Sequence, residues 1–379
     1  MCCYMEQLDL IPYVDVGETP RYLQEQLITY IGSKRALLPF IGDAVLGVRK
    51  ALGRDKISVL DMFSGTGVVA RYFKQYASLI IANDLEAYSR VTNKCYLSNA
   101  SEAGVKRLAE SCKWLRSKIL HEWSPGMICE LYAPKDEAKI CEDDRAFYTR
   151  RNATYLDTAR QAIGQLPQDQ QTYFLAPLLA EASVHANTSG VFKGFYKNEK
   201  GVGQFGGSGK DALLRILGHI ELQMPVLSRF ECEWRVFQED ANLLAEQLPH
   251  VDLAYFDPPY NQHPYGSNYF MLNLLVDYKK PEQTSRVSGI PVDWNRSRYN
   301  QRREASNALF DLIGKCDAKF CLISYNSEGF IPHEEFLERL GKLGGIEVCQ
   351  TPYNTFRGSR NLSGRSMHVT EYLYLLRKD

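Results

Sequence analysis

The chain has 379 residues, of which 45% are hydrophobic and 24% are charged, so a disordered or fibrous protein is excluded and one large domain with an insert is expected. Lysine plus arginine number 45 and aspartate plus glutamate also number 45, so net charge gives no support to a nucleic-acid partner. No run of about 18 apolar residues occurs, and no signal-peptide pattern opens the chain, so we expect neither membrane association nor export. The ten cysteines lack a Cys-x-x-Cys pair, which predicts no metal site and fits a reducing cytoplasm.

The first hundred residues give the clearest secondary-structure signals. Residues 1–22 are expected to form a loose N-terminal tail, and "LITYIGSKRALLPFIGDAVLGVRKAL" predicts an extended segment and then a helix with Pro39 in its first turn. The stretch "KISVLDMFSGTGVVARYF" predicts a strand, a glycine-rich turn and a helix, and "ASLIIANDLEAYS" predicts a second strand that ends on an acidic residue. This order forms a βαβ unit, so we expect the two strands to be parallel.

The middle of the chain has a different composition. Apolar residues at helical spacing from Val105 to Ile119 lie among lysines and arginines, which indicates an amphipathic helix. Its basic face is either a solvated surface or a surface that contacts phosphates. The stretch "VHANTSGVFKGFYKNEKGVGQFGGSGKD" predicts a long exposed loop, because it is rich in glycine, asparagine and aromatic residues.

Strand-like runs return in the C-terminal part of the chain. They are "CEWRVFQED", "VDLAYFD", "AKFCLISYN", "GIEVCQTPY" and "HVTEYLYLL", and the last two predict an antiparallel pair at a sheet edge. Between the second and third runs, residues 280–305 predict a basic loop in which arginines alternate with aromatic residues. That mixture is typical of nucleic-acid contact, and a charged surface loop is the alternative. The candidate DNA-binding residues are Arg296, Arg298, Tyr299, Arg302 and Arg303.

The glycine-rich turn favours a ligand that carries a nucleoside. Gly65 and Gly67 allow a tight turn and a close approach of the backbone to a ligand. Asp84 follows about 20 residues later, at the end of the next strand, where a carboxylate can bind a ribose. Glu86 is the alternative ribose contact, and a helix N-cap is the alternative role of Asp84.

The stretch "YFDPPY" follows a run that predicts a buried strand. Asp257 therefore emerges at the carboxyl end of a strand, where open α/β sheets bind their ligands. Pro258 and Pro259 lack an N–H and stiffen the segment, so that a carboxylate and a carbonyl form a fixed pair of acceptors. Such a pair can accept both N–H groups of an exocyclic amine and localise its lone pair, while Tyr260 stacks on the ring. A simple turn is the alternative.

The motifs "YIGSKRALLPFI", "VLDMFSGTG", "ANDLE" and "FDPPY" together resemble the adenine-specific DNA methyltransferases of the Dam-like (alpha) group, and "YGSNYFMLNLL" and "YNTFRGSRNLSGRSMHVTEYLYLL" resemble its restriction-modification members. The resemblance runs from about residue 30 to the C-terminus. It implies an α/β fold, a Rossmann-like sheet that binds S-adenosylmethionine, with an inserted target-recognition domain. The implied catalytic domain comprises residues 23–104 and 228–379, the implied recognition region residues 105–227, and residues 280–305 the DNA-contacting loop.

The resemblance also implies roles for individual residues. Tyr30 and Lys34 would lie near the methionine end of the cofactor, Asp84 would bind its ribose, and Asp240 would face its adenine, with a helix cap as the alternative for Asp240. The implied cofactor-binding residues are Tyr30, Lys34, Asp61, Phe63, Ser64, Gly65, Thr66, Gly67, Asp84, Leu85, Asp240, Ala241 and Asp257. The implied catalytic residues are Asp257, Pro258, Pro259 and Tyr260.

These observations predict a site-specific methyltransferase that acts on the N6 amine of adenine in duplex DNA after base flipping, without a metal. Methylation of cytosine C5 is excluded because it needs a cysteine nucleophile, typically after proline, and the chain has no Pro-Cys step. Cytosine N4 methylation, methylation of RNA or glutamine, and a non-catalytic DNA-binding relative stay open. The expected partners are double-stranded DNA and a cognate restriction endonuclease, and the expected location is the cytoplasm, at the nucleoid.

Overall fold

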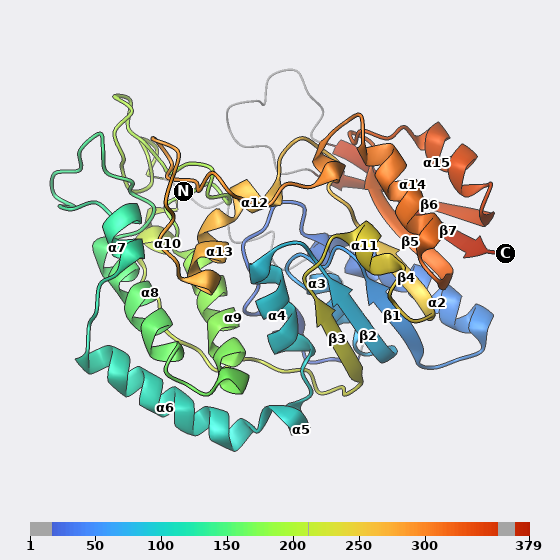
Figure 1. Ribbon diagram of the computed structural model, residues 1–379, viewed down its shortest axis with the longest axis horizontal. Helices are drawn as coiled ribbons and strands as arrows, with labels where there is room; N and C mark the ends of the chain where they lie inside the picture. Colours follow the sequence, from blue (N-terminus) through green and yellow to red (C-terminus); the bar gives the residue numbers. More distant parts are fainter. Residues whose placement is uncertain (1–16, 211, 355–367) are drawn as a thin grey trace.

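A seven-stranded sheet forms the centre of the computed structural model, which describes residues 17–210, 212–354 and 368–379 (Figure 1). The strand order is β3-β2-β1-β4-β5-β7-β6. The strands are β1 (Ile57–Asp61), β2 (Ala77–Asn83), β3 (Glu233–Phe237), β4 (Val251–Phe256), β5 (Ala318–Asn326), β6 (Gly344–Asn354) and β7 (His368–Lys378). Strands β1 to β5 are parallel to one another, and β7 pairs antiparallel with both β5 and β6. The predicted parallel βαβ unit, the antiparallel edge pair and the Rossmann-like α/β fold are therefore confirmed.

Helices cover both faces of the sheet, and a separate group of helices lies beside it (Figure 1). The described residues form the α-helices α1 (Pro20–Gln24), α2 (Leu38–Leu52), α3 (Val68–Phe73), α4 (Ala87–Leu97), α5 (Ala100–Ala103), α6 (Val105–His121), α7 (Met127–Tyr132), α8 (Arg150–Ile163), α9 (Gln168–Val184), α10 (Leu213–Leu217), α11 (Ala241–Ala245), α12 (Tyr265–Asn268), α13 (Phe270–Asp277), α14 (Ala305–Lys315) and α15 (His333–Leu340). Two short 3-10 helices are η1 (Lys34–Leu37) and η2 (Arg298–Asn300). None of the helices within the described ranges is long and apolar enough to cross a membrane.

The core strands alternate their side chains between two apolar layers, as the period of an extended chain requires. On β4, Leu253 and Tyr255 pack with α2 and α3, while Ala254 and Phe256 pack with α14. All six residues of β4 are buried, which explains why the strand reads as a continuous apolar run in the sequence. The segment after β4 is thereby anchored on both faces of the sheet.

The helices from α6 to α9 pack on α4 and α13 and form a third apolar layer (Figure 1). Helix α6 begins at Val105 as predicted, and Leu108, Cys112, Leu115 and Ile119 are its buried residues. Within residues 185–210, between α9 and α10, the structure contains a long loop, and residue 211 lies outside the described residues. The recognition role of residues 105–227 stays a prediction.

The packed part of the chain begins earlier than expected. Residues 1–16 of the expected tail lie outside the described residues, but Glu18 and Tyr22 are buried. Tyr22 Oη donates to the Tyr96 carbonyl at 2.6 Å, and the buried Arg71 guanidinium donates to the Tyr22 and Glu25 carbonyls. Arg71 also stacks on the Tyr96 ring at 3.4 Å, so α1 is fixed to the third layer. Most of the tract "YNTFRGSRNLSGRSMHV", residues 355–367, also lies outside the described residues.

Candidate functional site

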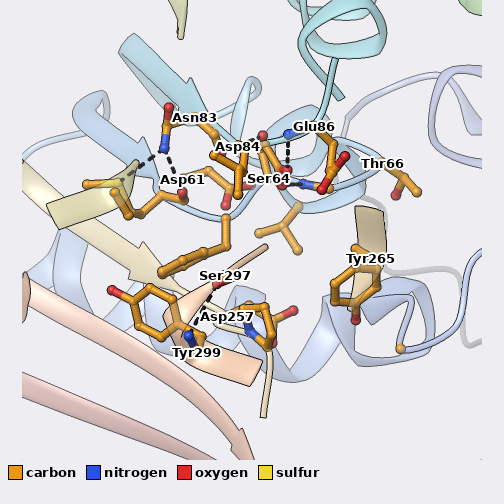
Figure 2. A pocket seen from close by; sticks show the side chains of 18 of the residues that line it. Asp61, Ser64, Thr66, Asn83, Asp84, Glu86, Asp257, Tyr265, Ser297 and Tyr299 are labelled. Carbon is orange, nitrogen blue, oxygen red and sulfur yellow. Dashed lines mark hydrogen bonds between the residues drawn. The ribbon is translucent and has the colours of Figure 1, made fainter. Parts of the chain in front are cut away.

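A pocket of about 920 Å³, counting its open side, lies at the carboxyl ends of β1, β2 and β4 (Figure 2). This is the edge of a parallel sheet at which α/β proteins bind ligands. The predicted site residues that line it are Tyr30, Lys34, Asp61, Phe63, Ser64, Gly65, Thr66, Asp84, Leu85, Asp240, Ala241, Asp257 and Pro259. Gly67, Pro258 and Tyr260 do not line it. The structure thus brings together residues that lie more than 200 positions apart in the sequence.

The glycine-rich turn forms one wall of this pocket. Gly65 and Gly67 have φ values of +50° and +76°, a backbone conformation that side chains larger than glycine rarely adopt. A Cβ atom at Gly67 would lie only 2.6 Å from Asn93 Oδ1, so this glycine serves the packing of α3 against α4. Gly65 N donates to Asp84 Oδ2 at 2.8 Å and thereby joins the turn to the end of β2.

Asp84 and Glu86 both line the pocket, but they have different partners. Asp84 Oδ1 accepts from Glu86 N at 3.0 Å, and Glu86 is the N-cap residue of α4. The Glu86 carboxylate accepts from Asn273 at 2.6 Å and from Asn295 at 3.1 Å. Burial raises the pKa of Glu86 to about 7, with the Asp84 carboxylate adding to the rise. Asp84 therefore keeps its carboxylate beside the glycine turn, where the ribose contact was predicted.

Asp61, the last residue of β1, is buried without a hydrogen-bond partner among the described residues. Asp61 is 1% exposed, and neither of its carboxylate oxygens accepts a hydrogen bond from a described residue. Burial raises the pKa of Asp61 well above its usual value, the Asp257 and Asp84 carboxylates add to the rise, and the nearby backbone N–H groups of Ala70 and Phe63 oppose it without reaching hydrogen-bond geometry. A buried carboxylate without a donor is costly for folding, so its place in a ligand pocket indicates that it serves a cationic or hydrogen-bond-donating ligand.

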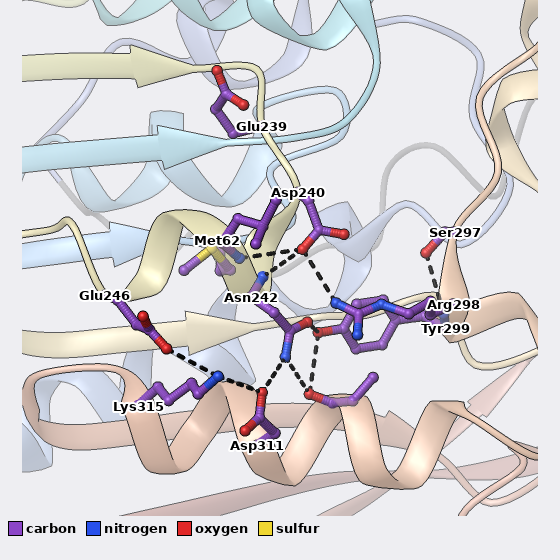
Figure 3. A network of polar contacts seen from close by, with 12 residues as sticks. Met62, Glu239, Asp240, Asn242, Glu246, Ser297, Arg298, Tyr299, Asp311 and Lys315 are labelled. Carbon is purple, nitrogen blue, oxygen red and sulfur yellow. Dashed lines mark hydrogen bonds and ion pairs between the residues drawn. The ribbon is translucent and has the colours of Figure 1, made fainter.

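The opposite wall is formed by Asp240 and the loop before α14 (Figure 3). Asp240 Oδ1 caps α11 by accepting from Asn242 N at 2.9 Å and Leu243 N at 3.2 Å, so its alternative role as a helix cap is observed. The same oxygen lies 3.3 Å from an Arg298 guanidinium nitrogen. Asp240 also lines the pocket, and its predicted contact with an adenine ring stays a prediction.

Tyr299 was predicted to contact DNA, and the structure contradicts this. Its side chain is 4% exposed, it packs edge-on against Phe63 with ring centroids 4.9 Å apart, and its hydroxyl donates to Asn242 Oδ1 at 2.7 Å. The apolar Tyr299 ring is more stable between Phe63 and α14 than in water. The composition of the loop does not show that this ring points inward. Tyr299 is thus part of the pocket wall, together with Asn295 and Ser297 of the same loop.

Asp257 lines the pocket (Figure 2). Its carboxylate forms an ion pair with Lys34. Lys34 Nζ lies 3.1 Å from Asp257 Oδ1 and 2.8 Å from Glu371 Oε1 on β7. Burial alone would lower the pKa of Lys34, but the two carboxylates outweigh this effect and raise it well above its usual value. Burial raises the pKa of Asp257 to about 6, with Lys34 opposing the rise and Glu371 adding to it.

A second, wider cleft lies on the other side of Asp257. Tyr260 lines this cleft together with Asn261, Gln262 and His263, and Tyr30, Gly32 and Ser33 line both cavities. The Tyr260 ring packs edge-on against Tyr325, with centroids 6.2 Å apart, and Lys34 Nζ lies 5.8 Å from its centre. Within the segment 257–260, Asp257 and Pro259 therefore line one cavity and Tyr260 lines the other, and the two cavities share Tyr30, Gly32 and Ser33.

The four predicted DNA-binding arginines are all exposed, but they have different neighbours. Arg302 lines the second cleft and lies 5.1 Å from the centre of the Phe330 ring. Arg296 stacks on Trp294 at 4.3 Å, and Arg298 is engaged with Asp240. Of the four, Arg302 is the one that faces the cleft next to Asp257, and its contact with DNA stays a prediction.

Sequence reasoning missed several residues of the site. Tyr265 stacks on Tyr30 with centroids 5.0 Å apart and rings nearly parallel, and it lines the pocket opposite the glycine turn. Glu371 was missed because its partner Lys34 lies 337 positions away, although both occur in quoted motifs. The tract "YGSNYF", which carries Tyr265, was noted only as a resemblance. Asn83 and Asn295 likewise line the pocket without an interpretable sequence signal.

The chain matches the family described as D12 class N6 adenine-specific DNA methyltransferase over residues 30–338. It is 29% identical over 359 residues to the type II methyltransferase M.NlaIII of Neisseria lactamica, covering 93% of this chain and 99% of that protein. M.CviAII of Paramecium bursaria Chlorella virus 1 is 28% identical over 357 residues, covering 92% and 98%. M.FokI of Planomicrobium okeanokoites is 27% identical over 375 residues, which cover 92% of this chain but 52% of that protein.

The likeness to solved structures is weak by comparison. A Thermoplasma acidophilum protein matches 94% of this chain and 94% of its own, at 10% identity and a TM-score of 0.34. The assignment therefore rests on the family match, which spans more than three quarters of the chain and includes the pocket, the Asp257–Tyr260 segment and the loop before α14. The chain belongs to the D12 class of N6 adenine-specific DNA methyltransferases.

Proposed function

We propose that this enzyme extrudes an adenine from duplex DNA into the second cleft and methylates its N6 amine at Asp257, at the junction of the two cavities. The observation that supports this most strongly is the position of the segment 257–260: Asp257 and Pro259 line the first pocket, and Tyr260 lines the second cleft. Transfer of a methyl group between two bound molecules needs this arrangement, because the donor and the acceptor must meet in line.

The residues of the first pocket fit S-adenosylmethionine, the methyl donor of this family. The unpartnered carboxylate of Asp61 suits the ammonium group of the methionine part, and Asp84 suits a ribose hydroxyl. Phe63 and Tyr299 offer an aromatic wall beside Asp240, which suits an adenine ring with its exocyclic amine. When bound there, S-adenosylmethionine would supply its sulfonium methyl group as an electrophile, with the S–CH3 bond breaking and the neutral thioether as the leaving group.

The residues of the chain prepare the acceptor amine. Lys34 occupies Asp257 Oδ1, so Asp257 Oδ2 and the Pro258 carbonyl are the proposed acceptors for the two N–H groups of the extruded base. Accepting both N–H groups localises the nitrogen lone pair, which then forms the new N–C bond. The alkylated nitrogen sheds one proton to Asp257 or to water, and Tyr260 offers its ring as a stacking surface for the base. These acceptors alone would also suit the N4 amine of cytosine, and the family membership selects adenine.

We also propose a place for this enzyme in the cell. The relatives M.NlaIII, M.CviAII and M.FokI are type II methyltransferases, which supports a role in a restriction-modification system with a cognate endonuclease. Such an enzyme works where the DNA is, in the cytoplasm at the nucleoid. Co-purification of an endonuclease activity that is blocked by prior methylation would support this part of the proposal.

The test is to incubate the enzyme with duplex DNA and S-adenosylmethionine, digest the DNA to nucleosides, and identify the product by mass spectrometry. We expect N6-methyldeoxyadenosine and no methylated deoxycytidine. Sequencing of the modified bases then gives the target site. Methylated N4 of cytosine, or cofactor binding without any methylated base, would overturn the proposal in favour of the two alternatives.

A further inference from the structure

A buried group of charges behind Asp257 involves a carboxylate, Glu371, to which the sequence patterns assign no role. Lys34, 5% exposed, and Glu371, 1% exposed, lie beneath the reacting segment, and Lys34 Nζ is closer to Glu371 Oε1 (2.8 Å) than to Asp257 Oδ1 (3.1 Å). Two further groups hold Glu371: Ser324 Oγ donates to Oε1 at 2.8 Å, and Asn326 Nδ2 donates to Oε2 at 3.4 Å. The Lys34 ammonium group thus pairs with two carboxylates. Of these, the Glu371 carboxylate accepts from three donors in all.

We propose that Glu371 is a positioning residue for methyl transfer: it anchors Lys34 so that Lys34 holds Asp257 in place without fully neutralising it. The proposal rests on the role of Asp257 in the proposed function. A lysine with Asp257 as its sole anionic partner would pair closely with that carboxylate and weaken it as an acceptor for the amine. A second carboxylate at 2.8 Å competes for the same ammonium group, so Asp257 keeps more of its negative charge.

The fold supports this assignment. Glu371 lies on β7, which pairs antiparallel with β5, and its register partner there is Asn326, one of its own hydrogen-bond donors. Lys34 lies in η1, at the N-terminal side of the sheet core. Burial of a charged pair is costly and contributes little net stability compared with apolar packing. A buried lysine and a buried carboxylate directly behind the partly exposed Asp257 therefore point to a task other than stability.

The other ionisable groups around Asp257 do not supply this effect. The groups that face Asp257 are Lys34 from η1, Glu371 from β7, Asp61 from β1, Tyr255 from β4 and Tyr265 from α12. Burial raises the pKa values of both tyrosines far above the working range, so these side chains stay neutral. Burial also raises the pKa of Asp61, which lies on the cofactor side of the pocket. Lys34 and Glu371 are the pair that sets the charge behind Asp257.

The test compares two variants whose predicted effects have opposite signs. Asp257 must be ionised to accept N–H groups, so the rate of methyl transfer falls as the pH drops through its pKa of about 6. In Glu371→Gln, Asp257 is the only carboxylate left to pair with Lys34, so its pKa falls. The acidic limb of the pH–rate profile therefore moves to lower pH, and the rate on the plateau above it falls because Asp257 is a weaker acceptor. In Lys34→Gln, Glu371 faces Asp257 without a cation between them, so the limb moves to higher pH, by about one pH unit. The measurement is the single-turnover rate of the full-length enzyme with a prebound duplex, from pH 5 to pH 9.

Asp252→Asn is the matched control, because it removes another buried carboxylate from the ends of β4 without touching Lys34. We expect it to lower the melting temperature and to leave the acidic limb in place. If Glu371→Gln does not fold, Glu371→Asp replaces it. Its shorter side chain withdraws from Lys34, so we expect the acidic limb of the pH–rate profile to move to lower pH as in Glu371→Gln, by a smaller amount. Limbs that stay in place, or that move in the same direction in both variants, would overturn the assignment of Glu371. Absence of adenine methylation by the unsubstituted enzyme would instead overturn the proposed function.

Discussion

The two ends of strand β4 carry carboxylates with opposite surroundings. Asp252, at its start, accepts from Arg54 at 2.8 Å, from Ser58 N at 2.8 Å and from Ser58 Oγ at 2.9 Å. Asp257, just after its end, has one cation that it shares with Glu371, and burial raises its pKa to about 6. The strand is the same and the burial is similar, but one carboxylate is saturated with donors and the other is not. Unsatisfied acceptors therefore mark the functional edge of this sheet.

The largest expected effect of a substitution is at Asp257. We expect Asp257→Ala to lower the single-turnover rate of adenine methylation by ~100-fold or more, because it removes an acceptor that acts on the amine in the transition state. The affinity for S-adenosylmethionine should change by only a few-fold, which isothermal titration calorimetry measures. A near-normal rate of methyl transfer would remove Asp257 from the mechanism.

The next largest effect is expected at Asp61, the other unsatisfied carboxylate of this edge. Asp61→Asn should weaken binding of S-adenosylmethionine by ~10- to 100-fold, as for the loss of one charged hydrogen bond. Because the folded-state pKa of Asp61 is raised, this group makes the free enzyme more stable as the pH falls from 8 toward 5, so the substitution should raise the melting temperature at pH 8 and flatten its pH dependence.

Asp84→Asn is the matched control for Asp61, since Gly65 N and Glu86 N already donate to its carboxylate. We expect this change to lower the melting temperature rather than raise it. Equal melting temperatures for the Asp61 and Asp84 variants, measured by differential scanning fluorimetry without ligand, would contradict the distinction between unsatisfied and satisfied carboxylates.

A smaller effect, on stability alone, is expected at the other end of β4. Asp252→Ala leaves Ser58 N without its acceptor and should lower the free energy of unfolding by about 1–3 kcal/mol, a range that allows for the partly exposed Arg54, which water can solvate again. The methylation rate per folded molecule should stay unchanged. Urea denaturation gives the first quantity, and a loss of rate without a loss of stability would show that the two ends of the strand are coupled.

The smallest effects concern DNA binding. Arg302→Gln should weaken binding of duplex DNA a few-fold and reduce the slope of log affinity against log salt by about 0.9, as for the loss of one phosphate contact. Arg298→Gln should reduce the slope less, because Asp240 already neutralises part of its charge. Fluorescence anisotropy at several salt concentrations distinguishes them, and equal slopes would show that the Asp240 pair opens when DNA binds.

Local sequence patterns predicted most of the fold and one wall of the site. The strand, turn and helix around Gly65 are encoded within about 30 residues, and their composition and spacing suffice to identify them. Partners from distant segments could not be found in this way. Glu371 meets Lys34 only because β7 lies next to β5, and nothing in the tract "HVTEYLYLL" distinguishes this glutamate from one on a surface strand.

The wrong interpretation of Tyr299 has a similar physical cause. Arginine and aromatic residues in one loop are typical of a nucleic-acid surface, but a loop has an inner and an outer side. Here the exposed arginines lie outside, while Tyr299 and Asn295 face the pocket. Composition describes the loop as a whole, and the direction of each side chain depends on the fold that the loop covers.

Strand β7 is synthesised after all the other strands of this sheet, yet it lies between β5 and β6. Strand β6 pairs with β7 and not with β5, so β6 is joined to the rest of the sheet only through β7. The same late strand delivers Glu371 to Lys34. A chain that has its glycine turn and its "DPPY" segment but not yet this strand therefore lacks the second carboxylate partner of Lys34.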